Sequence, residues 1–158
     1  MNYNIRFAVE DDFEKLITLF KEFALFEKVP EKMNNSAEQM KKEKEFFNCF
    51  VAENSEKEIV GYTIFFYFYL SWSGKCLYMD DLYVKENFRG NGIGRSLIES
   101  VMKFARENGC CKLRRQVSGW NKKAIDFYKK LGAEIDEIER NCTIKLDANV
   151  SRGTILEL

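Results

Sequence analysis

The stretch CLYMDDLYVKENFRGNGIGRS, residues 76–96, decides the fold of this 158-residue chain. It consists of an apolar strand, a short polar link, a glycine-rich turn over residues 89–94, and the start of an amphipathic helix. Backbone N–H groups at the start of a helix have no intrahelical partner and carry partial positive charge, so they can bind phosphate oxygens. Glycine has no side chain to keep a phosphate away from those groups. We therefore predict a pyrophosphate-bearing cofactor at this turn.

Two carboxylates lie inside the strand that precedes the turn. Asp80 and Asp81 occupy positions where a charge is costly unless it has a partner or a chemical task. One interpretation is a chemical site beside the cofactor, and the other is an ion pair with a Lys or Arg at the end of the strand. Both interpretations stay open for Asp80, whereas the structural one is favoured for Asp81.

The segments before the glycine turn alternate between strand and helix patterns. Four strands are expected there, the last three as an antiparallel meander: residues 3–7, 47–53, 58–70 and 75–84. Apolar residues at helical spacing predict helices over residues 13–27, from residue 93 to a stop at 108–109, and over 122–131. The polar segment 32–44 is either a loosely packed helix or a mobile flap.

The C-terminal part contributes three more expected strands. Residues 112–117 should run parallel to residues 75–84, because a strand–helix–strand connection joins parallel neighbours. Residues 134–138 and 142–146 have the pattern of a terminal strand pair. The length and the 46% hydrophobic content suit one domain over residues 1–158.

Composition excludes several classes of function. Lys plus Arg and Asp plus Glu number 25 each, so the basic excess that is typical of nucleic-acid binders is missing. The absence of histidine excludes Ser-His-Asp and Cys-His catalysis and most zinc enzymes. Five irregularly spaced cysteines without a C-x-x-C pair indicate reduced thiols and no metal site. With no signal-peptide pattern and no long apolar run, we expect a cytoplasmic protein without a membrane partner.

Several motifs in this order resemble the GNAT superfamily of N-acetyltransferases. Arg89-x-x-Gly92-x-Gly94 is similar to that family's pyrophosphate loop, Gln/Arg-x-x-Gly-x-Gly/Ala. The diamine (spermidine/spermine) and thialysine acetyltransferase branch shares longer matches, at residues 21–27, 49–53, 78–84, 120–121 and 127–129. The resemblance spans roughly residues 6–146. A dinucleotide-binding fold fits less well, because Arg95 replaces the third glycine and the turn follows a meander.

The resemblance implies an α/β fold of the mixed α+β type. Its central sheet would have about seven mostly antiparallel strands, helices on both faces, and a parallel central pair splayed for acetyl-CoA. A bulge near Asp81 would open the strand. No metal is implied. The implied cofactor-binding residues are Leu82, Tyr83 and Val84 for the pantetheine arm, Arg89, Gly90, Asn91, Gly92, Ile93, Gly94 and Arg95 for the pyrophosphate, and Asn121, Ala124, Tyr128 and Lys130.

The resemblance also implies acetyl transfer from acetyl-CoA to the primary amine of a small molecule by direct attack. An alkyl amine has a pKa of ~10.4, so it must lose a proton before it attacks. Asp80 matches the proton acceptor, and Tyr128 matches the group that protonates the departing thiolate, with a core position as the alternative for Tyr128. The implied assembly is a homodimer. The implied substrate-binding residues are Glu27, Trp72, Asp80, Arg114 and Gln116.

Three departures from that branch bear on the substrate. Asp80 stands where relatives have Glu, Leu70 replaces an acidic residue two positions before Trp72, and Arg114 and Arg115 replace apolar residues. Arginines repel a polycation and attract a carboxylate, which favours a lysine or thialysine analogue over spermidine. Transfer to a protein lysine or N-terminal amine, and a non-catalytic acyl-CoA-binding module, stay open as alternatives.

Overall fold

The computed structural model describes residues 2–139 and 141–144. Within them the chain forms two compact units, one ending at Gln116 and the other beginning at Val117. The first unit holds the sheet and three α-helices, and the second holds helix α4 (Lys122–Lys130). The expectation of one domain over residues 1–158 stays a prediction.

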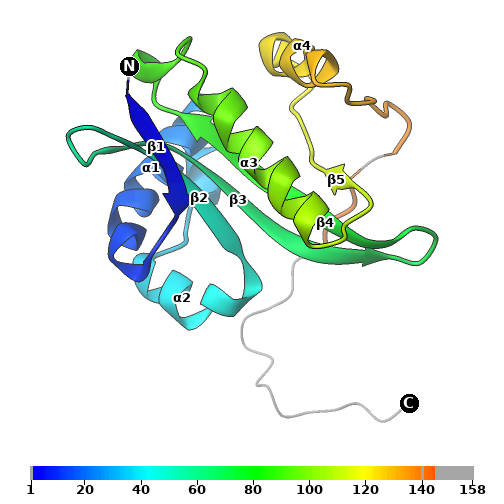
Figure 1. Cartoon of the computed structure of the whole chain (residues 1–158), viewed down its shortest axis with the longest axis horizontal. Coiled ribbons are helices and arrows are strands. Elements are labelled where there is room, and N and C mark those ends of the chain that lie inside the picture. Colours follow the sequence, from blue (N-terminus) through cyan, green and yellow to red (C-terminus); the bar gives the residue numbers. More distant parts are fainter. Residues whose placement is uncertain (1, 140, 145–158) are drawn as a thin grey trace. The chain divides into compact units, whose positions relative to one another are not determined.

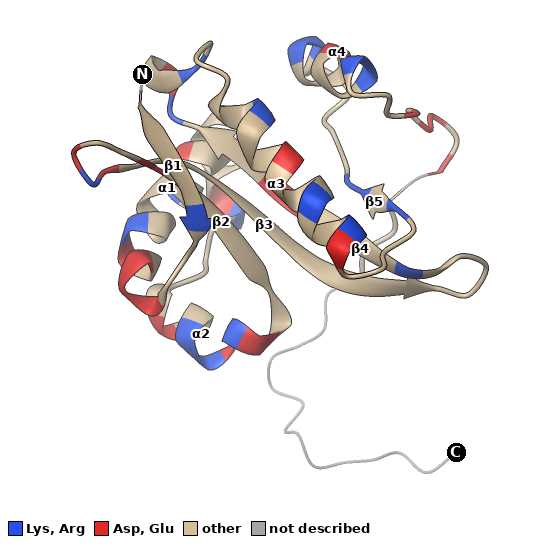
Figure 2. Cartoon of the chain, in the orientation of Figure 1, with Lys and Arg blue, Asp and Glu red and all other residues tan. Residues whose placement is uncertain are grey.

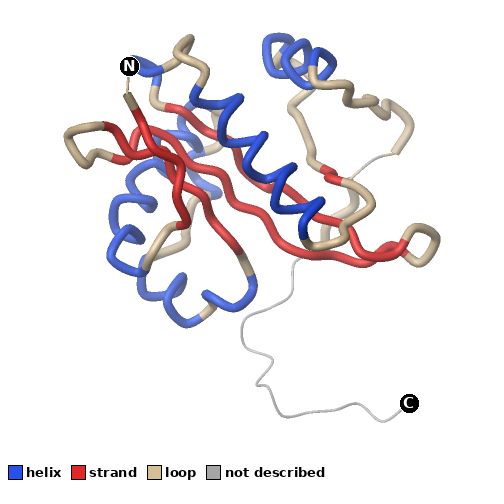
Figure 3. Tube along the Cα trace, viewed as in Figure 1, coloured by secondary structure: helices blue, strands red, loops and turns tan. Residues whose placement is uncertain are grey.

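A five-stranded sheet organises the first unit, with its strands side by side in chain order (Figures 1 and 3). The first four strands pair antiparallel, and β5 pairs parallel to β4. This confirms the mixed, mostly antiparallel sheet and its parallel pair. The strands are β1 (Tyr3–Phe7), β2 (Asn48–Asn54), β3 (Ile59–Leu70), β4 (Gly74–Val84) and β5 (Leu113–Arg114).

The expected count of about seven strands was wrong for the described chain. Residues 134–138 form no strand, and neither do the described residues 142–144, while residues 145–146 lie outside the described part. The apolar residues there have no buried face, since Ile138 is 89% exposed. β5 is likewise shorter than the expected residues 112–117. A strand pattern needs a neighbouring strand and a surface to cover, and these segments have neither among the described residues.

Helices cover both faces of the sheet, as expected. α1 (Phe13–Phe26) and α2 (Ala37–Lys42) lie on one face, and α3 (Ile93–Glu107) lies on the other (Figure 1). Two β3 residues three positions apart show the two faces: the Tyr62 ring lies 4.8 Å from Phe20 of α1, and the Phe65 ring lies 5.2 Å from Phe104 of α3. Short 3-10 turns connect these elements at Glu10–Asp12, Pro30–Lys32, Lys44–Phe46 and Glu86–Phe88.

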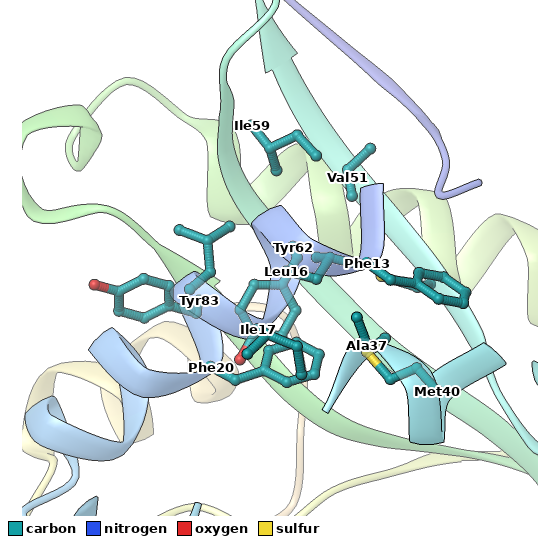
Figure 4. Close-up of a cluster of buried hydrophobic side chains, with 12 residues drawn as sticks. Phe13, Leu16, Ile17, Phe20, Ala37, Met40, Val51, Ile59, Tyr62 and Tyr83 are labelled. Atoms are coloured by element: carbon teal, nitrogen blue, oxygen red, sulfur yellow. The ribbon is translucent and has the colours of Figure 1, made fainter. Parts of the chain in front are cut away.

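One buried cluster fills the space between the sheet and the helices α1 and α2 (Figure 4). The members on α1 recur at three- and four-residue spacing, so they share one side of that helix. Ala37 and Met40 anchor α2, which resolves the open choice for residues 32–44 in favour of a helix, one of only six residues. The cluster comprises Phe13, Leu16, Ile17, Leu19, Phe20, Ala37, Met40, Cys49, Val51, Ile59, Tyr62 and Tyr83.

α3 has the amphipathic pattern that the sequence predicts. Its outer side carries the ion pairs Arg95–Glu99 and Lys103–Glu107, each four residues apart (Figure 2). The opposite side packs on the sheet, so the start of the helix is held beside the end of β4. Its buried residues are Ile93, Leu97, Ile98, Val101 and Ala105.

Candidate functional site

A β-bulge interrupts the pairing of β3 with β4 at the two carboxylates. Ile64 pairs with Asp81 and the next β3 residue, Phe65, pairs with Met79, so Asp80 is the extra residue. The predicted bulge near Asp81 is therefore present.

The bulge shifts the alternation of β4 by one residue. After it, N–H groups point to the other edge of the strand and side chains to the other face of the sheet than regular alternation would give. Leu77 donates its N–H to Lys112 at β5, whereas Lys85, an even number of positions later, donates to Val60 at β3. The side chains change faces in the same way. Met79 pairs with Phe65 of the α3 face, and Asp81 pairs with Ile64, which packs against the α1 cluster. The bulge thus carries the Asp81 carboxylate to the α1 side of the sheet.

Beyond the bulge, β4 continues without a neighbour on the β5 side. β5 pairs only with Leu77 and Tyr78, and no other described strand pairs with β4 along this edge. Strand alternation from Lys85 turns the N–H groups of Leu82 and Val84 toward the open side. Two of the three residues expected to hold a pantetheine arm therefore present donors along a free strand edge.

Asp81 is held at two points by consecutive residues of β3. The Tyr62 hydroxyl donates to Oδ2 of Asp81 at 3.1 Å, and the Thr63 hydroxyl donates to the main-chain carbonyl of Asp81 at 2.8 Å. Both donors are fully buried. The pKa of Asp81 is raised to about 6, mainly because burial disfavours the charged form and also because of the charge of Asp80, while the Tyr62 hydrogen bond opposes the shift.

Asp80, the extra residue of the bulge, lies near groups of both charges. Its side chain is exposed, yet the surrounding protein displaces enough water to raise the pKa of Asp80, with the charge of Arg115 acting in the opposite direction. Burial also raises the pKa of Tyr78, and the charges of Arg115 and Arg114 oppose that shift, as the charge of Arg115 does at Asp81. Two carboxylates and two arginines therefore act on one another's surroundings through their charges, near the point where the pairing of β4 with β5 ends.

The glycine turn has the geometry of an anion site. Gly90 and Gly92 have φ values of 80° and 79°, which only glycine adopts without strain. α3 starts directly after Gly92, and Ser96 is the first residue whose N–H bonds back to it, so the N–H groups of Ile93 to Arg95 precede the helical ladder. A Cβ on Gly90 would meet nothing within 4 Å. These residues fit a pyrophosphate.

The side chains of Arg89 and Asn91 stabilise the turn through hydrogen bonds to main-chain carbonyls and a contact with an aromatic ring. Arg89 donates from Nε to the Val84 carbonyl at 2.8 Å, and its guanidinium lies 4.6 Å from the centre of the Phe26 ring. Asn91 donates to the carbonyls of Phe88 and Arg89 at 3.1 and 3.3 Å. The turn is therefore fixed by contacts with β4 and α1.

The second unit holds the remaining expected cofactor residues on α4. Asn121 caps this helix, with its Oδ1 accepting from the Ala124 N–H at 3.1 Å. Tyr128 is 6% exposed and packs edge-on against Phe127 at 5.2 Å, whereas Lys130 is exposed. Because α4 belongs to the second unit, the approach of Tyr128 to Asp80 stays a prediction.

The expected substrate residues of the first unit differ in their relation to the bulge. Glu27 follows the last residue of α1, and its charge acts on Asp81. Arg114 lies in β5, and Gln116 is exposed just beyond it. Trp72 is 99% exposed at the turn after β3, roughly 20 Å along β4 from Asp80 at about 3.3 Å per residue. Within one chain, Trp72 is therefore not beside the carboxylates.

Tyr62 and Thr63 were not among the expected site residues. A tyrosine in the run Tyr62–Leu70 gives one signal, because a buried hydroxyl needs a partner. That partner follows from the register across the bulge, which the run itself does not encode.

No group of three or more His, Cys, Asp or Glu is arranged to hold a metal ion among the described residues. No helix within the same residues has the length and apolar character to cross a bilayer.

Comparisons with known proteins identify the family of this chain. The model of the acetyltransferase (GNAT) family matches residues 11–133. A thialysine N-epsilon-acetyltransferase from Sus scrofa is 38% identical over 140 residues, which cover 82% of this chain and 82% of that protein. One of the same name from Caenorhabditis elegans is 36% identical over 129 residues, 80% of each chain.

Solved structures share the fold. An aminoglycoside acetyltransferase from an uncultured soil metagenomic sample has a TM-score of 0.74 at 27% identity, covering 90% of this chain and 97% of that one. An integron cassette protein from V. cholerae has a TM-score of 0.76 at 20% identity, covering 93% and 94%, and this likeness concerns the fold alone.

Proposed function

Because the chain belongs to the acetyltransferase (GNAT) family, we propose that it transfers the acetyl group of acetyl-CoA to the primary amine of a small molecule. The observation that carries this proposal is the bulge of β4, which brings two carboxylates to the point where β4 parts from β5. Relatives that match most of this chain are named for acetyl transfer to thialysine, a small amine.

Acetyl-CoA supplies an activated acyl group as a thioester, and the chain supplies the surface that holds it. The N–H groups that begin α3 bind the pyrophosphate, with Arg89 and Asn91 keeping the turn in shape. The N–H groups of Leu82 and Val84 bind the pantetheine arm along the open edge of β4. In the second unit, the residues proposed from the resemblance to contact acetyl-CoA are Asn121, Ala124, Tyr128 and Lys130.

The amine arrives as a cation and has to lose a proton before it can attack. Asp80 accepts that proton in this proposal, since its raised pKa makes it a stronger base than an ordinary aspartate. The negative charges of Asp81 and Glu27 attract the ammonium group. Tyr128 donates a proton to the departing thiolate. The C–N bond forms as the C–S bond breaks, so no protein nucleophile is needed.

The amine also carries a carboxylate in this proposal. Arg114 and Arg115 lie within electrostatic reach of Tyr78, in the same charge field as Asp80 and Asp81. A substrate with an ammonium group at one end and a carboxylate at the other matches both signs of charge. Thialysine and lysine fit this description, whereas spermidine offers only positive charge. Trp72 and Gln116 remain proposed substrate contacts from the resemblance alone.

The test is release of free CoA thiol from acetyl-CoA by the purified chain, followed across a panel of amines. We expect the highest kcat/KM with thialysine or another lysine analogue, and a much lower value with spermidine and with lysine-containing peptides. Release with peptides alone would replace the small amine with a protein substrate. Tight binding of acetyl-CoA without release with any amine would contradict the enzyme. Light scattering of the same sample tests the homodimer that the resemblance implies.

A further inference from the structure

We propose that Tyr62 is a positioning residue for acetyl transfer, which acts through Asp81 by holding that carboxylate beside Asp80 from inside the core. This inference rests on the proposed function, in which the two carboxylates receive the ammonium group and its proton. It adds a residue that lies on another strand and that touches neither substrate nor cofactor.

The position of the Tyr62 hydroxyl is set by packing. Its side chain is fully buried in the α1 cluster, with its ring centre 4.8 Å from that of Phe20 and 6.1 Å from that of Tyr83 (Figure 4). A buried phenol needs a hydrogen-bond partner, and its hydroxyl donates to Oδ2 of Asp81 at 3.1 Å. The ring cannot turn without disturbing the core, so it fixes the direction of the carboxylate.

The main chain of the bulge is clamped by the neighbouring residue. Thr63 donates to the Asp81 carbonyl at 2.8 Å, while Tyr62 holds the side chain of the same residue. Two adjacent β3 residues therefore hold Asp81 at its backbone and at its carboxylate. Asp80 has no such β3 partner in the strand pairing, because it is the extra residue of the bulge. Its orientation depends on how firmly Asp81 is held.

The charge on Asp81 depends on every group that faces it. Tyr62 is the one that stabilises the charged form by donating a hydrogen bond, and Arg115 does so through its charge. Burial and the neighbouring carboxylates act in the opposite direction. Because Asp80 and Asp81 interact, they titrate as a pair, and the acid limb of a rate profile belongs to both. Among the described residues, the groups that interact electrostatically with Asp81 are Asp80 on β4, Tyr62 on β3, Cys49 on β2, Glu27 after α1, Tyr78 on β4 and Arg115 after β5.

Loss of the Tyr62 hydroxyl should therefore change how the pair ionises. Without its donor, Asp81 keeps its proton to a higher pH, because a hydrogen bond to the charged form lowers a carboxyl pKa. A protonated Asp81 no longer attracts the ammonium group. The reaction then needs a higher pH to reach its plateau.

The experiment compares the pH profile of kcat/KM in the wild type and in Tyr62→Phe, which keeps the ring and removes only the hydroxyl. We expect the acid limb to move upward by about one pH unit, the size of one hydrogen bond to a charged group. The matched control is Tyr67→Phe on the same strand, whose side chain is 41% exposed and lies against Phe104 of α3 on the other face of the sheet, and its limb should not move. An unmoved limb in a folded, active Tyr62→Phe protein would overturn the proposal.

A second readout does not depend on turnover. The NMR titration of the Asp81 carboxyl carbon should shift upward in Tyr62→Phe, and an unchanged titration again overturns the inference. In an Asp81→Asn background, Tyr62→Phe should add no further shift to the rate profile, and an additive shift would assign the effect elsewhere. A wild-type protein that transfers no acetyl group contradicts the proposed function instead, while the NMR titration still decides the Tyr62–Asp81 contact.

Discussion

The hydroxyl of Thr63 donates a hydrogen bond of 2.8 Å to the main-chain carbonyl of Asp81 across the bulge of β4. Thr63 is fully buried, and valine has nearly the same shape without the hydroxyl. Thr63→Val should therefore lower the free energy of unfolding by about 1 kcal/mol, the usual net value of one such bond. Chemical denaturation measures this change.

Thr18→Val is the matched control for Thr63→Val. Thr18 is exposed on α1, and its hydroxyl bonds only to the Glu14 carbonyl at 3.3 Å. Its replacement should change stability by less than about 0.5 kcal/mol. Equal losses at both positions would contradict a special role for the bond at the bulge.

Local patterns predicted the elements whose formation depends on local sequence. The stripe of α3 and the alternation of β2 to β4 each follow from a short run of residues. The failed segments are those whose structure depends on a distant neighbour: residues 134–138 have a strand pattern, but no described strand pairs with them. The contact between Tyr62 and Asp81 was not predicted for the same reason, because a shift of one position at the bulge changes the face of the sheet on which a carboxylate lies.

The left-handed glycine of the turn gives a prediction about cofactor binding. Gly92→Ala forces a side chain into φ of 79°, which costs about 1 kcal/mol or more and displaces the start of α3. We expect a raised KM for acetyl-CoA together with a modest loss of stability. Gly109→Ala is the control, because Gly109 has φ of 69° at the opposite end of the same helix. It should lose similar stability while its KM for acetyl-CoA stays that of the wild type.

Asp80 supports a prediction about the chemical step. Asp80→Asn keeps the size of the side chain but cannot accept the proton, so kcat/KM should fall by about 100-fold or more. Asp80→Glu restores the longer side chain of the related branch and should retain activity. Steady-state kinetics at pH 8 separates the two variants. An active Asp80→Asn enzyme would move the acceptor role to Asp81 or to a water.

The raised pKa of Asp81, about 6, makes stability depend on pH. The folded chain holds this proton more tightly than the unfolded chain, so the contribution of Asp81 to stability is present at low pH and falls as the pH rises through about 6. Asp81→Asn removes this dependence. The unfolding free energy of the variant relative to the wild type should therefore rise between pH 4 and pH 7. A constant difference over that range would contradict the raised pKa.

Arg115 gives the sharpest test of substrate choice. If it attracts the carboxylate of the amine substrate, Arg115→Leu should lower the ratio of kcat/KM for thialysine to that for spermidine by about 10-fold, because a hydrogen bond to a charged group is lost. Arg115 also lowers the pKa of Asp80 and Asp81, so the comparison belongs at pH 8.5, where both carboxylates are charged in either protein. At that pH a change in the ratio reports on how Arg115 interacts with the two substrates, and not on the ionisation of Asp80 and Asp81.

The matched control for Arg115→Leu is Arg106→Leu. Arg106 is an exposed arginine in the last turn of α3, so its loss removes the same charge from a different part of the first unit. The substrate ratio of Arg106→Leu should equal that of the wild type. A fall of both kcat/KM values by the same factor in Arg115→Leu would indicate a structural role for Arg115, because loss of a charge that repels spermidine should not lower the kcat/KM for spermidine. An unchanged ratio of kcat/KM for thialysine to that for spermidine in Arg115→Leu would contradict the proposal that Arg115 causes the preference for an amino acid.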